Sequence, residues 1–174
     1  VLMDTVDTRG IEEWSHNVEA SLGDRKLDYI VIQHAEPDHT GALKYALEKY
    51  PEAIVVGNAK TFTFLSQLFD VDLTGRTLEV KEGDSLCTGS HTLNFYVAPM
   101  VHWPEVMVTY ESSEKFLFSA DAFGKFGTTD ADEDWTCEAR RYYFNIVGKY
   151  GASVQMLLKK LAPLEINGIL PLHG

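Results

Sequence analysis

Four side chains able to bind a metal ion stand close together near the start of the chain. They are His34, Glu36, Asp38 and His39, and they follow the apolar stretch Tyr29–Ile32. Imidazole and carboxylate groups bind iron and zinc, and a strand end fixes the backbone while the loop beyond it lets several side chains converge. In an extended chain His34, Glu36 and Asp38 would face one side, and His39 would join them as the chain bends toward a helix. The run therefore predicts a metal site at the end of a strand.

Three further ligand-type residues occur later, each shortly after an apolar run that is typical of a strand. They are His102, Asp121 and His173, and with the first four they are enough for two metal ions. A carboxylate that arrives singly from another strand is suited to hold two cations close together, so Asp121 is the natural bridge. His16 and His91 lie outside any such pattern, and we expect them to be ordinary structural residues.

The ligand types restrict the metal without identifying it. A mixed set of imidazole and carboxylate suits iron or zinc, and the added carboxylate favours a harder, redox-capable ion such as iron. Zinc stays open, because the affinity order of the divalent metals places it above ferrous iron. Cys87 and Cys137 lie far apart, without the close pairing of a zinc or redox motif, and we expect reduced thiols with no chemical role.

The composition limits the class of protein. With 174 residues, 45% of them hydrophobic, the chain can bury a sizeable core, and we expect one globular domain over residues 1–174. A net charge of −11 argues against a nucleic-acid partner. No apolar run approaches the roughly 20 residues that cross a bilayer, and no signal-peptide pattern is present, so we expect a cytoplasmic chain without a membrane partner. The start without Met and the end one residue after His173 suggest an excised piece of a longer protein.

Short apolar strands alternate with helical patterns along the chain, which is typical of an α/β protein with helices outside a layered sheet. We expect strands at residues 1–6, 28–33, 53–56, 78–80, 92–97, 106–110, 115–119 and 166–170. We expect helices at residues 11–22, between Gly41 and Pro51, at 60–69, and one or two within 137–161. Every ligand candidate then sits where a strand passes into a loop.

Finer expectations follow from the same patterns. A turn at Glu82–Asp84 should connect strands 78–80 and 92–97, and a hairpin should join strands 106–110 and 115–119. The Gly-rich and then acidic segment 124–134 reads as a loop that can form a pocket wall. The buried stripe of the last helix is expected to consist of Val154, Leu157, Leu158 and Leu161.

These motifs resemble those of the flavodiiron proteins (A-type flavoproteins), a branch of the metallo-β-lactamase fold superfamily. Its hydrolase members carry His-x-His-x-Asp-His where this chain has His34-x-Glu36-x-Asp38-His39, so the glutamate is the diagnostic departure. The similarity continues through Pro99–Pro104, Phe118–Gly124, Tyr142–Ile146 and Pro171–Gly174, and it covers nearly the whole chain. It implies an α/β fold, the metallo-β-lactamase-like αββα sandwich, with the N-terminal strands missing here.

The resemblance also implies a role for each ligand candidate. One iron would be held by His34, Glu36 and His102, the other by Asp38, His39 and His173, and Asp121 would bridge the two. Two departures from the family leave the surroundings of the metals open. Ala120 stands where an Asn is familiar, and the segment Lys125–Gly127 differs from that of many members.

The resemblance further implies a reaction. The family reduces dioxygen to water or nitric oxide to nitrous oxide, with electrons from FMN on a flavodoxin-like domain that follows the metal domain. We expect that domain to be absent here, which would leave the fragment inactive alone, and Glu36 and Trp103 to lie nearest the flavin. The whole protein would form a head-to-tail homodimer and receive electrons from a protein such as rubredoxin. Two alternatives stay open: a dinuclear zinc hydrolase, against which Glu36 argues, and a non-catalytic diiron oxygen sensor.

Overall fold

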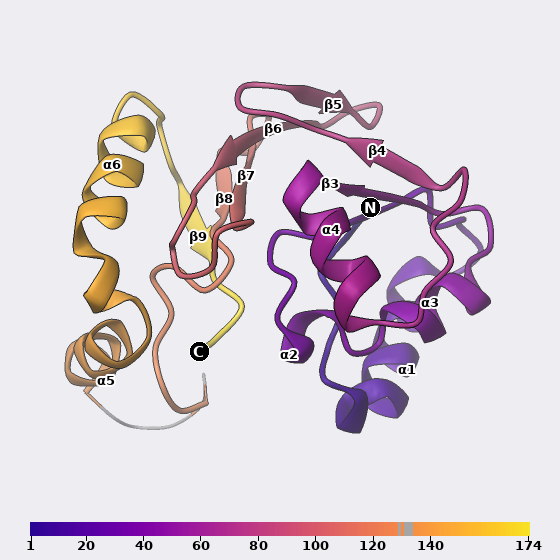
Figure 1. The fold of residues 1–174 in the computed structure, drawn as a ribbon, viewed down its shortest axis with the longest axis horizontal. Coiled ribbons are helices and arrows are strands. Elements are labelled where there is room, and N and C mark those ends of the chain that lie inside the picture. Colours follow the sequence, from indigo (N-terminus) through magenta and orange to yellow (C-terminus); the bar gives the residue numbers. More distant parts are fainter. Residues whose placement is uncertain (129, 131–133) are drawn as a thin grey trace. The chain divides into compact units, whose positions relative to one another are not determined.

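The computed structural model describes residues 1–128, 130 and 134–174, and these fall into two compact units (Figure 1). The N-terminal unit comprises Val1–Val80 and the C-terminal unit Lys81–Gly174. Each unit has its own sheet and its own hydrophobic core. No helix among the described residues is long and apolar enough to span a membrane.

The sheet of the N-terminal unit has four parallel strands in the order β1-β2-β3-β4. Parallel neighbours need crossover connections, and helices supply most of these here. The strands are β1 (Leu2–Met3), β2 (Tyr29–Val31), β3 (Ile54–Gly57) and β4 (Thr77–Glu79). The helices are η1 (Thr8–Gly10), α1 (Ile11–Leu22), α2 (Pro37–Thr40), α3 (Leu43–Lys49) and α4 (Ala59–Leu68). The helix expected at 11–22 is confirmed, whereas the first strand is shorter than expected.

The core of the N-terminal unit fixes the strand that leads to the ligand run. Ile30 of β2 and Val55 of β3 are paired in register and are fully buried, and they share one apolar cluster with Leu43 of α3 and Leu65 of α4. Val31, on the other face of β2, is fully buried as well. Central parallel strands are typically buried on both faces, which makes them rigid supports. The run from His34 onward therefore starts from a well-held strand end.

The sheet of the C-terminal unit has five strands in the order β5-β6-β7-β8-β9. Neighbours from β5 to β8 are antiparallel, and β9 runs parallel to β8. The strands are β5 (Ser85–Cys87), β6 (Thr92–Val97), β7 (Met107–Glu111), β8 (Phe116–Phe118) and β9 (Gly168–Leu170). The expected strand 92–97 and the expected hairpin of β7 and β8 are confirmed.

One connection differs from the expectation. The turn around Gly83 does not join strands 78–80 and 92–97, because it leads into β5, which pairs with β6, while β4 belongs to the other sheet. The strand Ser85–Cys87 was missed because it is only three residues long and two of its three side chains, those of Ser85 and Cys87, are exposed. Edge strands of this kind carry little hydrophobic periodicity.

Helical segments connect β8 to β9 and pack on one face of the sheet of the C-terminal unit (Figure 1). They are α5 (Trp135–Tyr142), the π-helical turn η2 (Tyr143–Val147), the 3₁₀ turn η3 (Gly148–Tyr150) and α6 (Gly151–Leu161). Val154, Leu157 and Leu161 of α6 join the core as expected. Leu158 does not, since it lies at the edge of that stripe and is 41% exposed. The loop expected at 124–134 includes residues 129 and 131–133, which lie outside the described residues.

Candidate functional site

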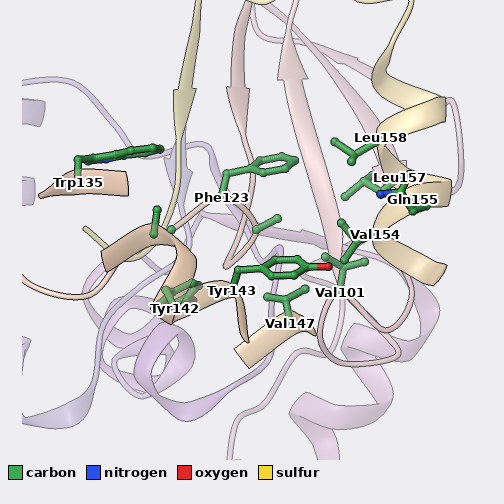
Figure 2. Close-up of a pocket in the computed structure, with 13 residues that line it drawn as sticks. Val101, Phe123, Trp135, Tyr142, Tyr143, Val147, Val154, Gln155, Leu157 and Leu158 are labelled. Atoms are coloured by element: carbon green, nitrogen blue, oxygen red, sulfur yellow. The ribbon is translucent and has the colours of Figure 1, made fainter. Parts of the chain in front are cut away.

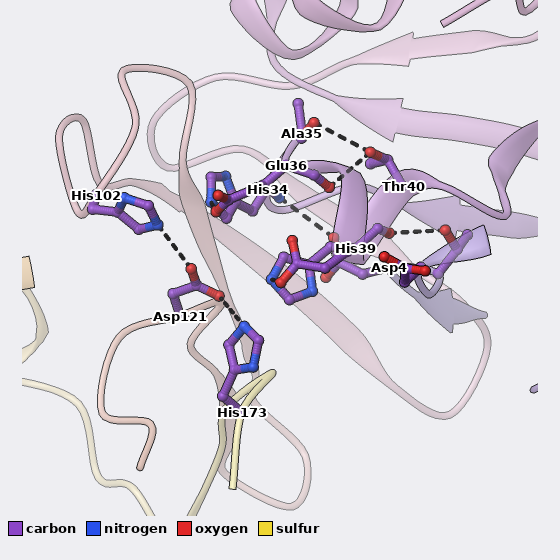
Figure 3. A network of polar contacts seen from close by, with 12 residues as sticks. Asp4, His34, Ala35, Glu36, His39, Thr40, His102, Asp121 and His173 are labelled. Carbon is purple, nitrogen blue, oxygen red and sulfur yellow. Dashed lines mark hydrogen bonds and ion pairs between the residues drawn. The ribbon is translucent and has the colours of Figure 1, made fainter. Parts of the chain in front are cut away.

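The four early ligand candidates lie together in the N-terminal unit, where β2 passes into α2. The Nε2 atom of His34 lies 3.1 Å from the Oε2 atom of Glu36. The Nε2 atom of His39 lies 3.3 Å from the Oδ2 atom of Asp38. The two imidazole rings are neighbours, with centroids 5.6 Å apart (Figure 3). The run therefore forms two adjacent imidazole–carboxylate pairs within one unit.

The change from strand-like to helical backbone within the run occurs at Glu36. Glu36 itself is extended, with φ −65° and ψ 144°, and Pro37 occupies the first turn of α2. Proline is favoured in the first turn because its φ suits a helix. The backbone N–H groups of that turn have no partner within the helix, so the N–H that proline lacks is not needed there. The extended alternation expected through Asp38 is therefore wrong beyond Glu36, and Asp38 and His39 project from the first turn of a helix.

Asp4 holds the backbone at the start of the run, and the sequence analysis missed it. Its carboxylate is 1% exposed, and it accepts hydrogen bonds from the backbone N–H of Gln33 (2.8 Å), from the Gln33 side-chain amide (3.0 Å) and from the backbone N–H of His34 (3.4 Å). Burial raises the pKa of Asp4 to about 6, although the hydrogen bonds from Gln33 act in the opposite direction. The only signal in the sequence was an isolated carboxylate within the strand-like segment 1–6.

Two threonines hold the rest of the run. The backbone N–H and the hydroxyl of Thr5 both donate to the carbonyl oxygen of His39, at 2.7 and 2.8 Å. The hydroxyl of Thr40 lies within hydrogen-bond distance of the carbonyl oxygens of Ala35 (3.2 Å) and Glu36 (2.8 Å). These bonds fix the backbone on both sides of the ligand side chains, which is what a preorganised metal site needs.

The three later candidates lie together in the C-terminal unit, with Asp121 between two histidines (Figure 3). The Oδ2 atom of Asp121 lies 3.0 Å from the Nε2 atom of His102, and the Oδ1 atom lies 3.4 Å from the Nε2 atom of His173. The Asp121 side chain is only 2% exposed, and those of His102 and His173 are 13% and 37% exposed. Each carboxylate oxygen therefore has its own imidazole, the arrangement of a carboxylate that can serve two cations.

The parallel pair β8 and β9 brings Asp121 and His173 together. Both strands end at the same edge of the sheet, and each ligand residue follows its strand after a short step. The two loops are joined by backbone hydrogen bonds from Leu172 N–H to Ala120 O (2.9 Å) and from Lys125 N–H to His173 O (3.2 Å). His102 arrives separately, from the loop between β6 and β7.

The other singled-out side chains have ordinary surroundings. The Trp103 ring stands edge-on to the His102 ring, with centroids 6.3 Å apart, and it packs partly buried against the core of the C-terminal unit. His16 is exposed on α1. His91 lies with its Nδ1 atom 3.2 Å from the carboxylate of Glu111, at the hairpin and away from the ligand candidates of its own unit. Neither histidine belongs to the two groups of ligand candidates described above.

Comparison with known proteins identifies the family. The family model described as ODP family beta lactamase matches residues 1–174. The chain is 34% identical over 185 residues to the anaerobic nitric oxide reductase flavorubredoxin of Vibrio vulnificus. This match covers 100% of this chain and 37% of that protein.

Two solved structures are also similar to the chain. One is the flavodiiron protein from Giardia intestinalis, with a TM-score of 0.90 and 32% identity, over 99% of this chain and 44% of that one. The other is the rubredoxin oxygen:oxidoreductase from Desulfovibrio gigas, with a TM-score of 0.88 and 30% identity, over 97% of this chain and 44% of that one. They confirm the expected metallo-β-lactamase-like α/β fold, although the chain spans less than half the length of each of these relatives. The chain therefore belongs to the ODP beta-lactamase family, and its metallo-β-lactamase-like domain is of the flavodiiron type.

Proposed function

We propose that this chain is the diiron domain of an oxidoreductase that reduces dioxygen to water or nitric oxide to nitrous oxide. The observation that carries the proposal is Asp121, a buried carboxylate whose two oxygens each face a separate imidazole. The relatives support the choice of reaction, because one is named a nitric oxide reductase flavorubredoxin and another a rubredoxin oxygen:oxidoreductase.

The proposed centre uses all seven ligand candidates. The pairing of His34 with Glu36 and of His39 with Asp38 within the N-terminal unit supports a division of that run between two metals. Imidazole and carboxylate donors without a thiolate fit iron. We assign His34, Glu36 and His102 to one iron, Asp38, His39 and His173 to the other, and Asp121 to the bridge.

The roles of the protein groups follow from their surroundings. Asp121 would place one negative oxygen toward each cation, which screens the repulsion between the two ions. Asp4 and Thr5 hold the backbone of His34 and His39, so that these imidazoles are positioned before a metal binds. His34 is fully buried and His39 nearly so, which keeps bulk water from competing for their nitrogens. When bound, two iron ions and a reduced flavin would supply the electrons that reduce the diatomic substrate.

The wider assembly is part of the same proposal. The whole protein would carry FMN on a flavodoxin-like domain, accept electrons from a protein such as rubredoxin, and pair head to tail with a second copy. The names of the relatives, which include flavorubredoxin and rubredoxin oxygen:oxidoreductase, support a flavin and a rubredoxin partner. In that assembly we place Glu36 and Trp103 nearest the flavin. A dinuclear zinc hydrolase is less favoured, because Glu36 adds a carboxylate where the hydrolases have a third imidazole.

Replacement of the proposed bridge tests this function directly. Protein produced with iron available should contain two irons per chain by elemental analysis and show a ferric absorption spectrum after air oxidation. Asp121→Ala should no longer bind two irons, because neither cation would keep its shared carboxylate. His91→Ala is the matched control, since His91 pairs with Glu111 outside the ligand set, and it should retain both irons.

Two results would contradict the proposal. An Asp121→Ala variant that still binds two irons would remove the bridge from the site. Wild-type protein that takes up zinc and excludes iron under equal supply would favour the hydrolase instead.

A further inference from the structure

The C-terminal unit contains a cavity of about 350 Å³ between its ligand-bearing loops and the helices α5 and α6. Figure 2 shows Phe123 and Tyr143 in the middle of the lining, with Val154 and Leu157 of α6 on one side and Tyr142 of α5 on the other. Every residue of the described lining belongs to this one unit. The cavity is therefore a feature of the C-terminal unit alone.

The lining has the chemistry of an apolar compartment. Aliphatic and aromatic side chains such as Val154, Leu157 and Phe123 form most of it, and no charged side chain occurs in the lining that the structure describes. A charged or strongly polar ligand would lose its hydration there without compensation. Trp135 and Leu158, which also line the cavity, are 61% and 41% exposed, so the compartment has an opening toward solvent.

Residues of the lining lie next to the three ligand candidates of this unit, in sequence for two of them and in space for the third. Val101 and Ala122 line it, and they are the chain neighbours of His102 and Asp121. Tyr142 lines it too, and its ring centroid lies 5.8 Å from that of the His173 ring. The lining therefore includes the chain neighbours of two ligand candidates and a ring that lies beside the third.

We propose that this cavity is a binding site for a small, neutral, apolar gas molecule, from which the substrate reaches the metal ligands past Tyr142. The identity of the gas as dioxygen or nitric oxide rests on the proposed function, whereas the binding of an apolar gas does not. An enclosed apolar cavity of about 150 Å³ stays dry and takes up xenon or benzene. This cavity is larger and partly open, but its walls are of the same apolar kind, and it has room for several gas atoms.

An organic ligand would need groups that fix its orientation, which a gas does not. Pockets for such ligands carry a few placed polar groups that fix the orientation of the ligand. Here the polar groups are few: Gln155 contributes a polar side chain from an exposed position, and Figure 2 shows the hydroxyl of Tyr143 directed toward the α6 side of the lining. A diatomic gas needs no orienting group, and as an apolar molecule it is more soluble in an apolar space than in water.

Xenon is the probe for the site, because it reports binding without any reaction. Xenon NMR or xenon-pressurised crystals of the wild-type protein should show one site against Val154 and Leu157. Val154→Phe should abolish that site by filling it from α6, and Met156→Phe is the matched control, since Met156 lies on the same helix, is 59% exposed and does not line the cavity. Ala139→Leu fills the cavity from α5 and serves if Val154→Phe does not fold.

Kinetics on the iron-loaded full-length protein form the second readout. The filled variants should show a higher KM for the gas with kcat and iron content unchanged, and Met156→Phe should match the wild type. Absence of xenon from the wild-type cavity, or xenon binding that survives both filling variants, would overturn the inference. Failure of the proposed function shows itself separately, as wild-type protein that binds xenon here but neither loads iron nor consumes either gas.

Discussion

Ala120 adopts a backbone conformation that alanine rarely takes, and it stands immediately before Asp121. Its φ is 52°, in the left-handed region, and its side chain is fully buried. This conformation costs an L-residue with a Cβ roughly 1–2 kcal/mol of conformational free energy, whereas Asn tolerates it better and Gly adopts it freely. The departure from the Asn that is familiar in flavodiiron proteins therefore places backbone strain next to the proposed bridge.

The strain at Ala120 predicts an unequal response to glycine. Ala46 is another fully buried alanine, inside α3. Ala46→Gly should lower the free energy of unfolding by about 2 kcal/mol, because the methyl group is lost and glycine has a low helix propensity. Ala120→Gly loses the same methyl group but relieves the strained φ, so it should be close to neutral. Chemical denaturation of both variants gives the two free energies of unfolding. Equal losses at the two positions would show that Ala120 is not strained.

The hairpin of β7 and β8 is closed by a buried carboxylate at the last residue of β7. Glu111 is 8% exposed in its side chain and accepts hydrogen bonds from the backbone N–H groups of Ser113 (2.8 Å) and Glu114 (2.7 Å). Burial alone would raise the pKa of Glu111, but these bonds and that from His91 outweigh it and lower the pKa to about 2. The charged form of Glu111 therefore stabilises the turn.

The sign of the resulting pH dependence follows from the lowered pKa. The stabilisation by Glu111 is complete above its ordinary pKa of 4.5 and disappears as the pH falls toward 2. Glu111→Gln should therefore lose up to about 3 kcal/mol of unfolding free energy at neutral pH and nothing near pH 2. Denaturation of metal-free protein across this range measures the difference. Glu114→Gln, on the exposed turn of the same hairpin, is the control, and a pH-independent loss in Glu111→Gln would contradict the assignment.

The whole molecule consists of two compact units, and each contains part of the proposed ligand set. Four of the seven lie in the N-terminal unit and three in the C-terminal unit. A metal held by side chains that come together only on folding would bind the folded chain and not the unfolded one. Its binding free energy therefore adds to the stability of the folded protein.

Metal removal should lower the thermal stability of the whole chain. At a free metal concentration of 100 times the Kd, loss of the metal costs about 2.7 kcal/mol, which corresponds to a fall in Tm of roughly 5–10 °C for a protein of this size. Calorimetry of the iron-loaded protein with and without a chelator measures the shift. Asp121→Ala should have the lower Tm already and should not respond to the chelator. An unchanged Tm after complete removal of iron from the wild type would show that the bound metals do not stabilise the folded chain.

Local patterns were enough to identify the family and much of the fold. The types and spacing of His34, Glu36, Asp38 and His39 indicated a metal site, and the family match confirms the flavodiiron type to which that run pointed. Helix 11–22 and strand 92–97 were predicted to the residue, because each shows its hydrophobic period over its whole length.

Other features depend on residues that the chain brings together from far apart. Asp4 touches the backbone of Gln33 and His34 only because β1 pairs with β2, about thirty positions along the chain, and no local pattern marks it. The exposure of Leu158, the pairing of β5 with β6, and the cavity behind Val101 and Ala122 are likewise consequences of packing. The sequence by itself determined which chemistry the chain can carry, because side-chain type and period are local properties. Only the tertiary structure decided which groups hold the backbone of the ligand candidates in place and where an apolar space is left, because both depend on how distant segments pack.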